Sequence, residues 1–134
     1  MNRENLQRMA DYIRTVPQEK FNMEFYRKGN EKHHKCNSVG CVIGHCTVLD
    51  DFDNIPTLWN DEINFTEWST NYTGIALRES EWIWCFDSLW NQTDNTPTGA
   101  AHRIEWLLNH GLPEDWFEQM TGKTPLIYRT DERK

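Results

Sequence analysis

The stretch from Cys36 to Cys46 constrains the fold more than any other part of the chain. It holds three of the four cysteines and, at positions 40 and 44, two of the seven glycines. The apolar positions 39, 42, 43 and 46 follow the i, i+3, i+4, i+7 spacing of a helix. Glycine inside a helix costs roughly 1 kcal/mol relative to alanine, a cost that is tolerable where another backbone approaches closely. We therefore expect a buried central helix over 38–49.

Two chemical roles for the same stretch compete with this packing interpretation. Cys41 and His45 are four residues apart and would share a helix face, with Cys36 just upstream, so a zinc ion could be held there. The cysteine intervals, however, differ from the paired short spacing of zinc knuckles. Alternatively, Cys36 at a helix N-terminus could be a nucleophile with a lowered thiol pKa, with His45 or His102 as its base. The packing interpretation is preferred, so we expect no metal and no cofactor.

Further helices are predicted from apolar residues at helical spacing. Thr96 is a candidate N-cap before Pro97, and Gly111 a candidate C-terminal stop, so the helix between them is well bounded. Phe21 and Met23 are expected to insert into the core from a loop. The sequence thus predicts an all-α single domain over 1–128 and a disordered tail at 129–134. Its roughly five helices are the central one and those at 3–15, 79–90, 98–110 and after Pro113, with a short turn of helix at 65–71.

The charge of the chain narrows the classes of partner. With 21 acidic and 14 basic residues the net charge is −7, which disfavours duplex nucleic acid, because duplex binding uses a basic face. An acidic chain is suited to docking on a basic protein surface. No apolar run is long enough to cross a membrane, and no secretion signal follows Met1. We therefore expect a cytoplasmic protein with reduced thiols and no membrane partner.

Two segments are candidates for a binding surface. Seven tryptophans is a large number for 134 residues, and tryptophan is enriched at binding hot spots. The connector over 50–74 is irregular and rich in aromatic residues, and long connectors are often functional. The segment 26–35 is a basic loop that could contact a phosphate or another anionic ligand. The candidate residues are Trp59, Trp68 and Tyr72 in the connector and Arg27, Lys28, Lys32, His33 and His34 in the loop.

Several of these patterns occur together in one known set of proteins. The pair Phe21 and Met23, the pattern Cys36-x-Ser38-x-Gly40-Cys41-x-x-Gly44-His45 and the later Thr96-Pro97 segment up to Gly111 resemble small uncharacterised proteins of bacteria and their phages. In that set the position of His45 often carries tryptophan, which implies that His45 is not an obligatory ligand or base. The resemblance implies a phage or mobile-element accessory protein and no particular activity.

Charge, tryptophan content and resemblance together lead to one preferred function. We expect a non-enzymatic binding protein that covers and inhibits a host protein of bacterial defence. One alternative is a small-ligand or nucleotide binder that stacks a base on tryptophan while the 26–35 loop contacts phosphate. Another is a Cys/His-dependent enzyme or a zinc-binding protein built on the 36–46 stretch.

Overall fold

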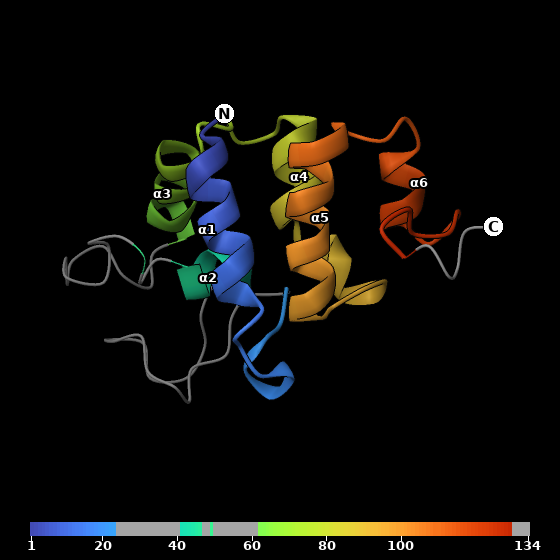
Figure 1. Cartoon of the computed structure of the whole chain (residues 1–134), viewed down its shortest axis with the longest axis horizontal. Coiled ribbons are helices and arrows are strands. Elements are labelled where there is room, and N and C mark those ends of the chain that lie inside the picture. Colours follow the sequence, from blue (N-terminus) through green and yellow to red (C-terminus); the bar gives the residue numbers. More distant parts are fainter. Residues whose placement is uncertain (24–40, 47–48, 50–61, 130–134) are drawn as a thin grey trace.

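The fold, obtained as a computed structural model, is described for residues 1–23, 41–46, 49 and 62–129 (Figure 1). In these ranges the chain forms helices and no β-strand, so the all-α prediction is confirmed. Four of the helices have seven residues or more. The α-helices are α1 (Arg3–Ile13), α2 (Val42–Cys46), α3 (Glu62–Thr73), α4 (Ser80–Phe86), α5 (Pro97–His110) and α6 (Trp116–Met120), and the short 3-10 helices are η1 (Gln18–Lys20) and η4 (Ser88–Gln92).

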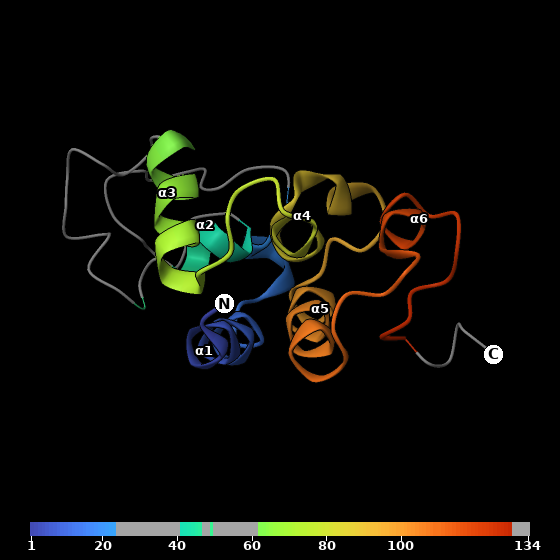
Figure 2. The ribbon, with the colours of Figure 1, turned by 90° about the horizontal axis from the view of Figure 1, so that it is seen from above.

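The helices are arranged in two layers. α1 and α5 run side by side in opposite directions (Figure 1) and form the largest helix–helix contact. Seen from above, these two lie in one layer, and α2, α3, α4 and α6 lie in the other (Figure 2). α1 also contacts α2 and α3, and α4 contacts α5 and α6. α1 therefore joins the two layers at one end of the molecule, and α4 and α5 join them in the middle.

Of the expected central helix over 38–49, the structure describes only α2, Cys41 and Leu49. Val42, Ile43 and Cys46 are fully buried, as the packing interpretation requires. α2 packs on α1 and α3. Gly40 lies outside the described residues, as do positions 38, 39, 47 and 48. Within the described ranges α1, rather than α2, takes part in the most extensive helix–helix contact, the one with α5.

The boundaries of α1 and α5 follow from capping and burial. The Asn2 side chain accepts a hydrogen bond from the Asn5 amide at 3.0 Å, which caps α1. The Thr96 hydroxyl accepts from the Gly99 amide at 3.0 Å, and Gly111 ends α5 with φ 81°. The predicted 3–15 and 98–110 helices are confirmed to within two residues. Their buried stripes are Leu6, Met9, Ala10 and Ile13 in α1 and Ala100, Ala101, Ile104, Leu107 and Leu108 in α5.

Two predicted helix ranges are wrong in their extent. The helix expected over 79–90 breaks at Asp87, whose backbone is extended and whose carboxylate accepts from the Leu89 amide at 2.9 Å to cap η4. The N-cap of α4 is Glu79. The short helix expected over 65–71 is longer, since α3 has 12 residues.

The segments outside the main helices are held to the core as the sequence predicted. Phe21 and Met23 are buried, and the Met23 amide donates to the Asn95 side chain at 2.7 Å. Leu126 is buried beyond α6, so the chain near its end docks on the bundle. The expected tail falls outside the described residues from position 130 on. Within the described ranges, every helix is too short or too polar to cross a lipid bilayer.

Candidate functional site

Most of the predicted site residues belong to parts of the chain that the structure does not describe. The basic loop and one aromatic residue of the connector fall there, together with the first cysteine of the central stretch. Their proposed roles stay predictions. These residues are Arg27, Lys28, Lys32, His33, His34, Cys36 and Trp59.

Trp68 and Tyr72 are core residues of α3. Their rings stack at 4.8 Å with an interplanar angle of 14°, as i, i+4 neighbours on one helix face can. The two residues are only 7 % and 8 % exposed. This burial corrects the expectation that they lie on an open surface that faces a partner. Their aromatic area stabilises the fold by leaving water.

His45 and Cys41 are both buried, and the histidine serves as a structural link. The His45 Nε2 atom lies 2.6 Å from the Lys20 carbonyl oxygen. Because a carbonyl can only accept, Nε2 carries the proton and donates. The ring thus joins α2 to η1 and has one nitrogen committed to the backbone. Among the described residues no group of three His, Cys, Asp or Glu side chains could hold a metal ion, so Cys41 and His45 have no third ligand there.

The buried thiols of the described core are poorly suited to nucleophilic chemistry. Burial raises the pKa of Cys46 well above its ordinary value and raises that of Cys85 to about 12. The Cys46 Sγ donates to the Met9 carbonyl at 3.7 Å, where α2 meets α1. A thiolate, and not a thiol, is the nucleophile, so thiols kept protonated by burial are inert.

A buried polar network joins the start of α5 to the last described residues. Asp94 and Arg103 form an ion pair at 3.6 Å with side chains 1 % and 0 % exposed. The Arg103 Nη1 donates to the Tyr128 hydroxyl at 2.9 Å, which in turn donates to Asp94 at 2.8 Å. The Thr96 hydroxyl donates to the other Asp94 oxygen at 2.6 Å. Each oxygen of the buried Asp94 carboxylate thereby accepts one hydrogen bond.

An aromatic cluster completes this network. The Arg103 guanidinium lies 4.1 Å from the centre of the Trp90 ring, a cation–π contact. Trp84 packs edge-on against both Trp90 and Tyr128. Burial raises the pKa of the Tyr128 hydroxyl above its ordinary value. This cluster was not predicted from the sequence. The residue that could have indicated it is Arg103, because it is a charged residue on the buried face of α5, between Ala100 and Leu107.

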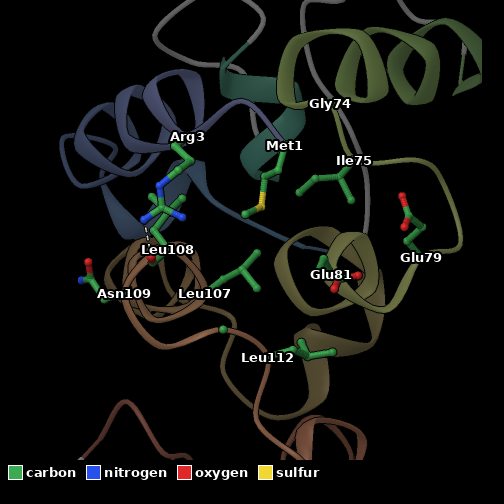
Figure 3. A pocket seen from close by; sticks show the side chains of 11 residues that line it. Met1, Arg3, Gly74, Ile75, Glu79, Glu81, Leu107, Leu108, Asn109 and Leu112 are labelled. Carbon is green, nitrogen blue, oxygen red and sulfur yellow. Dashed lines mark hydrogen bonds between the residues drawn. The ribbon is translucent and has the colours of Figure 1, made fainter.

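A pocket lies at the end of the bundle near Met1. It has a volume of about 400 Å³ (Figure 3). The apolar side chains of Met1, Ile75, Leu107 and Leu112 line it, and they come from the start of α1, the α3–α4 connection and the end of α5. Its size is at the lower end of the range for ligand pockets.

Charged side chains of opposite sign flank this pocket. Arg3 donates a hydrogen bond to the Leu108 carbonyl, which holds its guanidinium at one side. Glu79 and Glu81 stand at the other side, Glu79 beyond Ile75 and Glu81 nearer to Leu112 (Figure 3). The Glu79 carboxylate accepts from the Ala76 amide at 2.9 Å, whereas Glu81 is half-buried and has no hydrogen bond or ion pair with described residues.

Comparison of the chain with protein-family models, curated proteins and solved structures finds no significant match.

Proposed function

We propose that this chain is a non-enzymatic binding protein, an accessory protein of a phage or mobile element that covers and inhibits a host protein of bacterial defence. The observation that supports it best is the burial of His45 and of the cysteines among the described residues. Cys41, His45, Cys46 and Cys85 all lie in the core, where His45 and Cys46 form hydrogen bonds to backbone carbonyls. Contacts of the described chain with another molecule would therefore be made by its surface side chains.

That surface carries features suited to a protein partner. Leu77, Leu89 and Phe117 are 43 %, 40 % and 48 % exposed, on three different segments. Exposed apolar side chains on an acidic protein can anchor a contact, while the net charge of −7 favours approach to a basic surface. Residues in other parts of the chain, such as Trp59, remain candidate contributors.

The alternative functions have less support. Stacking of a nucleotide base needs an accessible ring, and among the described tryptophans Trp106 and Trp116 are half-buried, whereas Trp68, Trp82, Trp84 and Trp90 are buried. Catalysis by a cysteine needs a thiolate, which burial of the described thiols opposes.

The proposal is tested by isolating a host partner and mapping the contact. The purified chain is incubated with lysate of a candidate host, and any retained protein is identified, purified and titrated against the chain. Leu77→Ser, Leu89→Ser and Phe117→Ser each remove an exposed apolar anchor. We expect at least one of them to weaken the complex tenfold or more, about 1.4 kcal/mol.

Gln92→Ser is the matched control, because Gln92 is exposed and uncharged in the same helix, η4, as Leu89. It should leave both affinity and stability unchanged. Absence of a saturable, stoichiometric partner across candidate hosts would count against the proposed function.

A further inference from the structure

Two charged side chains of opposite sign lie at opposite sides of the pocket near Met1. Arg3 stands at one side, and Glu81 stands at the other, with Met1 and Leu107 between them and Ile75 and Glu79 farther along the wall (Figure 3). Neither Arg3 nor Glu81 has an ion-pair partner among the described residues. Two opposite charges without counter-charges, separated by apolar side chains, are complementary to a molecule that carries an anion, an apolar group and a cation.

The positions of the two charges are set by the fold. Arg3 is in the first turn of α1, and its hydrogen bond to the Leu108 carbonyl orients the guanidinium across to the end of α5. Glu81 is in the first turn of α4, where a carboxylate is favoured by the helix dipole. A ligand would meet the Arg3 guanidinium already oriented, which lowers the entropic cost of binding.

The apolar lining favours a branched aliphatic group. Ile75, Leu107 and Leu108 are 3 %, 4 % and 8 % exposed, so they form a fixed wall. Met1 is 53 % exposed and has a flexible, polarisable side chain that can close over a guest. The volume of about 400 Å³ has room for one apolar amino acid or a dipeptide.

We infer that the pocket between Arg3 and Glu81 binds a small zwitterion with an apolar side chain, of the class of aliphatic amino acids and their dipeptides. Arg3 pairs with the ligand carboxylate, Glu81 pairs with the ligand ammonium group, and the aliphatic side chain contacts Ile75 and Leu107. This inference is independent of the host-protein partner proposed above.

The test uses three ligands that differ by one charge. L-leucine carries both charges, N-acetyl-L-leucine lacks the ammonium group, and L-leucinamide lacks the carboxylate. Each is titrated into isotopically labelled protein, and the backbone amide shifts of Ile75, Leu107 and Leu112 are followed by NMR. We expect saturable binding of L-leucine, weakened about fivefold by loss of either charge, since exposed ion pairs contribute up to about 1 kcal/mol.

Variants of the two charged residues complete the test. Glu81→Gln should abolish the preference for L-leucine over N-acetyl-L-leucine and keep the preference over L-leucinamide. Arg3→Gln should do the reverse, and Arg3→Lys, which keeps the positive charge, should retain both preferences. Circular dichroism of each variant verifies that it is folded.

Three results would overturn the inference. They are shifts that never saturate with L-leucine, shifts that map away from the pocket, and equal binding of all three ligands to the wild-type protein. None of them bears on the host partner, which is measured separately by lysate capture.

Discussion

Gly99 is a position in α5 where any side chain would collide with a buried charge. A Cβ atom built on its backbone overlaps the Asp94 carboxylate. That carboxylate is held by the hydroxyls of Thr96 and Tyr128 and by the Arg103 ion pair, so it cannot move aside without breaking the network. Glycine is therefore required here for space, although it weakens a helix.

We predict that Gly99→Ala lowers the free energy of unfolding by about 2–3 kcal/mol, even though alanine is the better helix former. The displaced Asp94 would leave Arg103 with a less well-compensated buried charge. Urea denaturation of both proteins measures the difference. Thr98→Ala, at the exposed neighbouring position, should change stability by less than about 0.5 kcal/mol. Equal stability of Gly99→Ala and the wild type would contradict the overlap.

The sequence predicted the position of α5 in the chain, but it did not predict the contacts of Arg103. Periodicity identifies the buried face of a helix, but the partners of a buried charge come from elsewhere in the chain. Tyr128 is 25 residues away from Arg103. Asp94 precedes the helix, in a loop that carries no recognisable pattern. Only the three-dimensional arrangement brings these three groups together.

At the scale of elements, α1 and α5 are joined by polar contacts along the edge of their apolar interface. The Arg14 guanidinium forms a short ion pair with the Glu105 carboxylate, which also accepts from Gln7 at 2.9 Å. The hydrogen bond from Arg14 is the main reason that the pKa of Glu105 is lower than its ordinary value of 4.5. Both side chains are about a quarter to a third exposed, so solvent screens the pair.

This pair should give α1–α5 packing a measurable dependence on acid pH. Because the folded state lowers the pKa of Glu105, its contribution is complete above pH 4.5 and is lost as the pH falls through the lower folded value. We predict that Glu105→Gln removes at most about 1 kcal/mol near neutral pH and that its stability curve converges on the wild-type curve in acid. Urea denaturation over a pH series measures both. Parallel curves would exclude the contribution.

The lengths of α3 and α4 show where the prediction of helix boundaries from apolar periodicity fails. The buried face of α3 includes Ser69 and Thr73, both fully buried, so its apolar periodicity is interrupted although the helix is regular. The fold satisfies them internally, since Thr73 donates to the Ser69 carbonyl and Ser69 accepts from the Trp82 indole. In α4, the residues around Asp87 have helical periodicity, and a local cap overrides it.

At the scale of the whole molecule, the described thiols report on opening of the core. Cys41, Cys46 and Cys85 are buried thiols, the first two at α2 and the third in α4. A reagent can reach them only when the helices around them separate. Their raised pKa values, shown for Cys46 and Cys85, add to this protection.

We predict that iodoacetamide modifies these three cysteines at least about a hundredfold more slowly in native buffer than in urea. Peptide mass spectrometry at successive times resolves the cysteines from one another. Similar slow rates at all three would indicate one cooperative opening. Rapid modification of Cys46 in the native protein would contradict its burial and reopen the case for thiol chemistry.

The pocket near Met1 could not have been predicted from sequence patterns. Its lining comes from three stretches, near positions 1–3, 74–81 and 107–112, that lie far apart in the chain. Each stretch has an ordinary local role, such as capping or ending a helix. The pocket exists only because the ends of α1, α3 and α5 meet.

The pairing of α1 with α5 also sets the order in which the chain can mature during translation. The apolar stripe of α1 leaves the ribosome before its main partner, α5, which is completed only at His110. Until then, Leu6, Met9 and Ile13 lack their largest helix contact, and incompletely covered apolar helices are prone to aggregation. Burial of α1 is thus completed only after α5 has been made, so we expect chaperones that shield nascent chains to protect α1 in the interval.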